Sequence, residues 1–358
     1  MTSKERVRDA LEHRQPDRVP LDYYARAEVS AAVRARLGLG AGESVEEALG
    51  ADLRGVGPRF GPPSHELGYA DPTVEVTPDG LYRDIWGVGF RANQTEVGFY
   101  MDLADCPLRG LREVGELDDY PWPSADDWDY SGLPTQLDAA GEYWTWGASR
   151  GIFEISWFMR GFEEFMLDLA LRPELAGALM DRVQAYLLER TRRLLAASGG
   201  RLDMVEYNDD TGGQNGLLLS PAMWRQFLRP RMVEFIGLCR EHGARVRYHS
   251  CGGVRPIIPD LIEIGVDALN PVQTMAAGME PAALKRDFGD RITWSGGVDT
   301  QGLLPNGSRE EVAAHTRWLI ETLGKDGGLI LGPAHVFQPD VPVENVLAVY
   351  ETALGRRL

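Results

Sequence analysis

A histidine and a cysteine stand two residues apart where a short run of β-forming residues gives way to glycines. The run reads RVRYHS over 245–250, and His249 and Cys251 precede Gly252 and Gly253. Side chains two apart on a strand project to the same side if the strand continues through them. Imidazole nitrogen and thiolate sulfur suit zinc. The pair therefore predicts part of a metal site, with a purely structural His–Cys pair as the alternative.

A second histidine ends another run of the same kind, LILGPAH over 329–335. If both runs are parallel strands of one barrel, His335 opens onto the same rim and converges with the first pair. Three protein ligands plus an open position is the arrangement of catalytic zinc sites. We therefore expect His249, Cys251 and His335 to bind a metal. The alternative for His335 is a hydrogen bond to a loop.

Carboxylates are concentrated after the run MVEYND, where Glu206, Asn208, Asp209 and Asp210 follow one another closely. Carboxylates are costly when buried without partners, so they should face substrate, a metal or a basic group. We expect Glu206 or Asp209 to complete a metal shell or, with His335, to serve as general acid and base. Helix capping or a turn is the alternative for Asp209 and Asp210.

Polar side chains also follow the other strand-like runs, and their shared place at strand ends is what selects them. They include Gln301 and a set from which we expect substrate contacts: Tyr23, Asn208, Asn270, Gln273 and Asp299.

Eight β-branched or aromatic runs must position these residues. They alternate with longer helical patterns, which is typical of repeated βα units. The pattern predicts an α/β fold, a (β/α)8 TIM barrel with its active site at the carboxyl ends of the strands. An open doubly wound sheet is the alternative, but no G-x-G-x-x-G opens a helix after the first run. The runs cover 19–24, 52–57, 143–149, 204–209, 245–250, 268–272, 293–298 and 329–335.

We expect residues 1–358 to form a single domain. Apolar residues at three- and four-residue spacing predict helices over 173–198 and 221–243. The segment 58–142 follows the second run and carries Gly, Pro and Asp-rich turns without a long helical pattern. It predicts an insertion of hairpins and loops that covers the barrel.

Composition limits the partners of the chain. The formal net charge of −17 repels nucleic acid and anionic membranes. No apolar run approaches the roughly 20 residues that span a bilayer. Three cysteines are too few and too widely spaced for a disulfide framework, which fits a reducing compartment. We therefore expect a cytoplasmic protein that acts on a small molecule and binds neither nucleic acid nor membrane.

Three stretches together resemble the uroporphyrinogen decarboxylase family: HSCGGVRPIIPDLIEIGVDALNPVQ (249–273), FGDRITWSGGVDTQGLLP (288–305) and GGLILGPAHVFQPDVPVENV (327–346). The resemblance implies a (β/α)8-barrel enzyme and a homodimer. It also implies one of two chemistries. Some members remove carboxyl groups from porphyrinogen acetates without a cofactor, and others are methyltransferases that work with a methyl-corrinoid and a zinc ion.

The chain departs from the decarboxylases after its first run. Their arginines in this region hold substrate carboxylates, whereas VPLDYYARAE keeps only Arg26, and their essential aspartate has its counterpart in Asp52. The methyltransferases bind zinc through a His-x-Cys and a later cysteine. His249 and Cys251 match the first two, and His335 stands in the third place, where the decarboxylases also have a histidine.

The resemblance thus implies a zinc-dependent methyltransferase that moves a methyl group between a small substrate and a corrinoid. The chain has no D-x-H-x-x-G-type cobalamin signature, so the corrinoid is expected on a separate protein. A cofactor-free decarboxylase of a porphyrinogen-like or other small carboxylate is the alternative.

Overall fold

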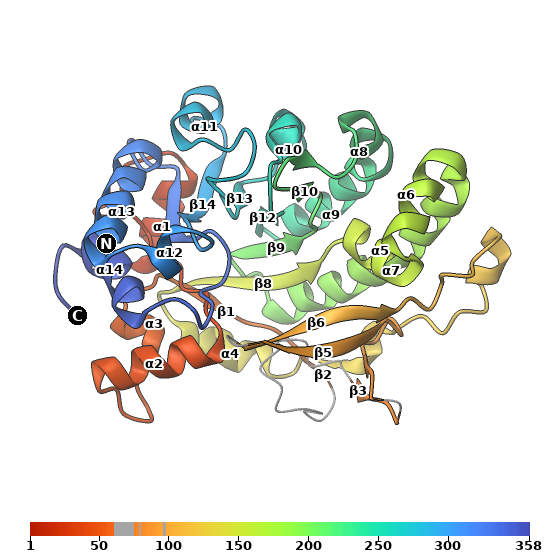
Figure 1. Cartoon of the computed structure of the whole chain (residues 1–358), viewed down its shortest axis with the longest axis horizontal. Helices are drawn as coiled ribbons and strands as arrows, with labels where there is room; N and C mark the ends of the chain where they lie inside the picture. Colours follow the sequence, from red (N-terminus) through yellow and green to blue (C-terminus); the bar gives the residue numbers. More distant parts are fainter. Residues whose placement is uncertain (61–74, 79, 96–97) are drawn as a thin grey trace.

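A curled parallel sheet of seven strands forms the centre of the molecule (Figure 1). The computed structural model describes residues 1–60, 75–78, 80–95 and 98–358. The predicted parallel α/β sheet is confirmed, and seven of the eight predicted runs contribute its strands. In spatial order they are β1 (Leu53–Gly55), β8 (Trp144–Arg150), β9 (Met204–Asn208), β12 (Arg245–His249), β13 (Ala268–Asn270), β14 (Thr293–Val298) and β15 (Leu329–Pro333).

The first predicted run forms isolated bridges instead of a strand, and it contacts both edges of the sheet. Leu21 is bridged in parallel to Leu331, and Asp22 N–H donates to the Leu331 carbonyl at 2.8 Å. On the other side, Asp52 N–H donates to the Leu21 carbonyl at 2.7 Å. Segment 19–25 therefore joins β15 to the start of β1.

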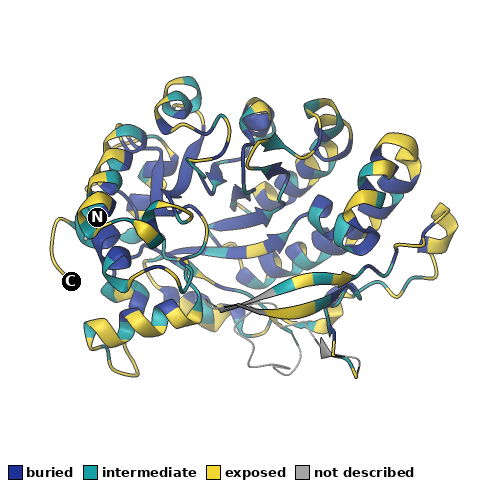
Figure 2. Ribbon diagram, in the orientation of Figure 1, coloured by how far each residue is buried: buried dark blue, intermediate teal, exposed yellow. Residues whose placement is uncertain are grey.

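Helices lie on the outer side of the curl (Figure 1). They pack on it through buried apolar residues, and most residues of the strands are buried (Figure 2). They include α5 (Ile152–Arg160), α6 (Phe162–Leu171), α7 (Pro173–Ser198), α9 (Arg229–Glu241), α11 (Pro281–Phe288), α13 (Arg309–Leu323) and α14 (Val343–Leu354). Shorter ones include α8 (Pro221–Phe227), α10 (Ile258–Ile264) and α12 (Leu303–Asn306), and α1 (Ser3–Leu11), α2 (Ala27–Leu37) and α3 (Val45–Ala48) precede the sheet.

One predicted helix is divided. The pattern over 221–243 predicts a single helix, but α8 ends at Phe227 and α9 begins at Arg229. Pro230 explains the break, because proline lacks the N–H that would continue the hydrogen-bond ladder and its ring crowds the preceding turn. The predicted start is confirmed, since the Ser220 side chain accepts the N–H of Met223.

Short strands lie between β1 and β8, within the segment 58–142 for which an insertion was predicted. β3 (Glu75–Val76), β4 (Tyr82–Arg83), β5 (Gly89–Thr95) and β6 (Gly98–Asp105) form a four-stranded sheet, and β2 (Arg59–Phe60) pairs with β7 (Trp128–Asp129). Two 3-10 turns, Val114–Leu117 and Ala125–Asp127, and the helix α4 (Leu133–Ala140) complete the region. Residues 61–74, 79 and 96–97 of the predicted insertion lie outside the described residues. That the region covers the barrel stays a prediction.

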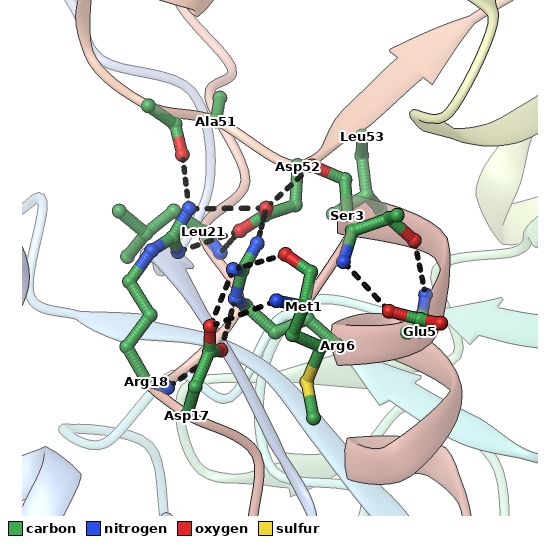
Figure 3. Close-up of polar contacts among 12 residues, drawn as sticks. Met1, Ser3, Glu5, Arg6, Asp17, Arg18, Leu21, Ala51, Asp52 and Leu53 are labelled. Atoms are coloured by element: carbon green, nitrogen blue, oxygen red, sulfur yellow. Dashed lines mark hydrogen bonds and ion pairs between the residues drawn. The ribbon is translucent and has the colours of Figure 1, made fainter.

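A buried carboxylate ties the chain together where segment 19–25 meets β1 (Figure 3). Asp52 is fully buried and accepts from Arg6 at 2.6 Å, from Arg18 at 2.7 Å, from the Ser3 hydroxyl at 2.7 Å and from the Leu21 N–H at 2.8 Å. Asp52 directly precedes β1, so it lies at the amino end of the strand. By the resemblance, Asp52 is the counterpart of the essential aspartate of the decarboxylases. It thus lies at the amino ends of the strands, opposite to the carboxyl ends that carry the candidate site.

Across the described part of the chain, no helix is both long enough and apolar enough to cross a bilayer.

Candidate functional site

The three predicted metal ligands converge at the carboxyl ends of β12 and β15. His249 ends β12, Cys251 follows in the loop, and His335 follows β15. Their donor atoms all lie within 4.8 Å of one another, and His249 Nε2 is 3.7 Å from Cys251 Sγ. Nitrogen and sulfur bound to one tetrahedral zinc ion are about 3.5 Å apart. The sequence prediction that these residues share one place is therefore met by the geometry.

A neighbouring strand fixes the orientation of the His249 ring. His249 and Asn270 are register partners on β12 and β13, and His249 Nδ1 lies 2.7 Å from Asn270 Oδ1. The Asn270 amide donates to the Ser295 hydroxyl at 3.1 Å, which places its oxygen toward the imidazole. His249 therefore donates through Nδ1, and the lone pair of Nε2 is left on the Cys251 side. Metal-bound histidines are held in this manner, so the donor set fits a zinc ion.

Close backbone packing holds the Cys251 loop in place. β10 (Gly212–Gly213) and β11 (Gly216–Leu217) form a hairpin against it. A Cβ atom on Gly212 would lie 2.5 Å from the Cys251 carbonyl oxygen, and one on Gly252 would lie 2.5 Å from the backbone of Gly213. Gly252 also has φ +81°, which side-chain-bearing residues rarely adopt. Glycine is thus required on both sides of this contact.

Two further side chains hold the same loop through its backbone. Asp210 accepts the N–H of Cys251 at 2.8 Å, and Gln273 accepts the N–H of Gly252 at 2.8 Å. Gln273 was predicted to bind substrate. Its side-chain carbonyl oxygen instead holds the loop that positions the Cys251 thiol.

The electrostatic surroundings favour neutral side chains in the metal-free protein. Burial raises the pKa of the Cys251 thiol, and the Asp210 carboxylate raises it further. Desolvation in the recess lowers the pKa of the His335 ring, and His249 lowers it further. A bound cation would reverse the preference of the thiol, because it stabilises the thiolate.

A recess of about 40 Å³ opens beside these residues. Three predicted site residues line it together with the two histidines. Its lining residues are Asp22, Tyr24, Glu206, Asn208, Arg247, His249, Asn270, Gly296, Gly332, Pro333 and His335. The prediction that strand-end residues form one pocket is thus met for Glu206, Asn208 and Asn270.

A buried arginine dominates one wall of the recess. Arg247 donates through Nη1 to Asp22 at 2.8 Å, and its Nε pairs with Glu206. Burial opposes the charge, but the two carboxylates outweigh it and the pKa of the guanidinium is raised. Trp146 lies 5.1 Å from the guanidinium, measured to the ring centroid. Glu206 is therefore positioned by its ion pair with Arg247.

Asp209, predicted as an acid or base, lies elsewhere. It is buried and accepts the N–H groups of Phe153 at 3.2 Å and Glu154 at 2.8 Å, at the start of α5. Burial raises the pKa of its carboxyl to about 8, although the two N–H groups act in the opposite sense. The capping alternative describes its position, because the first turn of a helix has free N–H donors.

Two predicted substrate residues also lie outside the recess. The Tyr23 hydroxyl is 3.0 Å from Ser30 and its ring packs on Phe337 and Tyr350, while its neighbour Tyr24 lines the recess. Asp299 accepts the N–H of Leu303 at 2.9 Å at the start of α12. The alternation of side chains along an extended segment explains the first difference, and helix capping explains the second.

The sequence interpretation missed Asp22, Tyr24 and Arg247. A signal for Arg247 was present, because it stands two residues before His249 on the same strand and so shares its face. Asp22 and Tyr24 likewise stand two apart in the first run, on the face opposite to Tyr23.

Comparison with known proteins places these observations in context. The family model described as uroporphyrinogen decarboxylase (URO-D) matches residues 136–355. The uroporphyrinogen decarboxylase of Coxiella burnetii is 23% identical over 185 residues, which are 50% of this chain and 47% of the relative. The chain therefore spans about half the length of the curated relatives that it matches.

Among solved structures, a methyltransferase from Methanosarcina mazei superimposes with a TM-score of 0.70. The alignment covers 99% of both chains at 18% sequence identity. At that identity the likeness shows a shared fold, a TIM-barrel-like α/β architecture.

Proposed function

This chain belongs to the uroporphyrinogen decarboxylase family, and we propose that within it the chain is a methyltransferase that moves a methyl group between a small substrate and a corrinoid on a separate protein. The observation that carries the proposal is the convergence of His249, Cys251 and His335 within 4.8 Å. The fold shared with the Methanosarcina methyltransferase supports it.

His249, Cys251 and His335 would hold a zinc ion, which when bound supplies a Lewis acid that lowers the proton affinity of a substrate heteroatom. The chain itself contributes orientation. Asn270 fixes the His249 tautomer, and the glycine contact holds the Cys251 loop. The narrow recess would admit the reacting group of the substrate beside His249 and the Cys251 loop.

Proton movement is assigned to Glu206. Its carboxylate lines the recess, where it can accept a proton that a substrate hydroxyl or amine releases as it is methylated, and the ion pair with Arg247 orients it. Asp209 is assigned to the α5 terminus instead, because its carboxylate accepts the backbone N–H groups of Phe153 and Glu154 in that helix.

We further propose that segment 19–25 is the eighth stave of a (β/α)8 barrel and that residues 1–358 form one domain. The hydrogen bonds of this segment to Leu331 and Asp52 support the first point. The cytoplasmic location and the homodimer stay predictions.

Metal analysis tests the proposed centre. Protein purified without chelators should contain about one equivalent of zinc, and Cys251→Ala and His335→Ala should lose most of it. Cys106→Ala and His242→Ala are matched controls, since both residues lie outside the recess and should leave the metal content unchanged. Less than about a tenth of an equivalent of any transition metal in the parent protein would contradict the metal site.

Methyl transfer is then tested directly. Methylated corrinoid protein should lose its methyl group to a thiol or other acceptor only when this chain is present, and Cys251→Ala should abolish the reaction.

The curated Coxiella relatives favour a second candidate, a cofactor-free decarboxylase of a small carboxylate. Such an enzyme would keep full activity in a strong chelator and would release CO₂. The chelator therefore separates the two candidates.

A further inference from the structure

Among the described residues that line the recess, Arg247 is the one with a permanent positive charge. Two carboxylates pair with its guanidinium group. Nη1 donates to Asp22 at 2.8 Å, and Nε pairs with Glu206. The Arg247 side chain is 3% exposed. Two carboxylates against one guanidinium leave this wall with a net negative charge.

The rest of the wall offers acceptors in the same way. The Asn208 amide donates to the Ser149 carbonyl at 3.2 Å, which leaves its own carbonyl oxygen for a ligand. The Asn270 amide donor is held by Ser295. Arg26, the arginine retained in the first run, is absent from the lining.

An anionic ligand would therefore meet like charges in a partly buried space, where repulsion is poorly screened. A hydroxyl, amine or ammonium group would instead donate to carboxylate oxygens, which can only accept. Aromatic surface from Tyr24 on the wall adds a favourable contact for a cation.

We infer that the substrate presents a hydrogen-bond donor, a hydroxyl or amine, to Asp22 and Glu206, and that in the metal-free protein these two carboxylates disfavour carboxylate ligands. The inference rests on the proposed function only in taking this recess as the substrate pocket. Asp22 and Glu206 are then the residues that determine specificity.

Ligand-observed NMR with three probes of equal carbon number tests the inference on the full-length protein. Propylamine, 1-propanol and propionate differ only in the charge and hydrogen bonding of their polar group. Wild-type protein should bind propylamine at least about tenfold more tightly than propionate, with propanol between them. Tighter binding of propionate, or no binding of any probe, would overturn the inference.

Isosteric variants assign the effect to the two carboxylates. Glu206→Gln should weaken propylamine and strengthen propionate by about tenfold each, because Arg247 then lacks one of its two anions. Asp22→Asn should act in the same direction and serves if the first variant does not fold. Glu310→Gln, an exposed glutamate of α13, is the matched control. Unchanged preferences in a folded variant would overturn the assignment.

Failure of this inference is distinguishable from failure of the proposed function. Probe binding is measured on metal-free protein without a corrinoid. A chain that transfers methyl groups but prefers propionate would contradict the charge argument alone.

Discussion

The His249 ring takes its orientation from one amide on the next strand. Asn270 accepts from His249 Nδ1 at 2.7 Å, and Ser295 keeps the amide from turning over. Partners of this kind hold the tautomer that leaves the other ring nitrogen available, and their loss typically costs 10–100-fold in metal affinity. Asn270 is thus a positioning residue in the proposed centre.

We predict that Asn270→Leu lowers zinc affinity about 10–100-fold, whereas Asn270→Asp, which keeps an acceptor, retains it. Competition with a chromophoric chelator measures the affinity. Nitrogen-15 shifts of the His249 ring in metal-free protein provide a readout that a merely structural role would not move, since the Nδ1–H tautomer should dominate only in the parent and in Asn270→Asp. Asn306→Leu, on an exposed residue of α12, is the control. Equal affinities and tautomers in all variants would refute the assignment.

At the scale of elements, the first turn of α5 is capped by the carboxylate of Asp209, a residue of another segment. Asp209 accepts two of the first N–H groups of the helix. We predict that Asp209→Ala lowers the free energy of unfolding by about 1–2 kcal/mol, and that Asp209→Asn, which retains an acceptor, loses less. Urea unfolding measures both. Folded Asp209→Asn should also keep its turnover. Loss of turnover in that variant would return Asp209 to the catalytic role predicted from sequence.

The seam between segment 19–25 and β1 depends on Asp52. Arg6 is buried beside this carboxylate, so removing Asp52 leaves a buried cation without its buried partner. We predict that Asp52→Ala costs about 3–5 kcal/mol of unfolding free energy. Asp17→Ala removes a more exposed partner of the same arginine and should cost less than about 1 kcal/mol. Similar midpoints for the two variants in urea would show that the buried contact does not stabilise the seam.

At the scale of the molecule, the two edges of the curled sheet are joined by segment 19–25, which makes isolated bridges and few regular hydrogen bonds. We predict that the amides of Asp22, Asp52 and Leu331, which bond across this closure, exchange with solvent only through global unfolding. Their protection should match that of β14, whose six residues are all buried. Hydrogen exchange followed by NMR measures this. Much faster exchange at the closure than in β14 would mean that the curled sheet opens independently.

Much of this architecture could be predicted from sequence because parallel strands buried on both faces produce continuous β-branched runs. Seven runs became strands, and the convergence of His249, Cys251 and His335 followed from their shared place at strand ends. Residues 19–24 form only isolated bridges instead of a strand, because Pro20 has no backbone N–H to donate to a neighbouring strand.

The predicted site residues that lie outside the recess share a common physical cause. A polar residue after a strand looks the same in sequence whether it faces the recess or accepts a helix N–H. Asp209 and Asp299 do the latter, and Tyr23 faces the helices because the segment carries Tyr24 inward. Arg247 was overlooked because its charge is neutralised by partners from two distant segments, Asp22 and Glu206.

The interlocked backbones of Gly212 and Gly252 have a consequence for engineering. Neither segment leaves room for a methyl group on the other, so the position of the Cys251 thiol depends on two segments of chain instead of one. A graft of the Cys251 turn onto a different scaffold would need to bring 212–216 with it. Substitutions are better introduced at Asn208 or Tyr24, because they leave the contact between the Gly212 and Gly252 backbones intact.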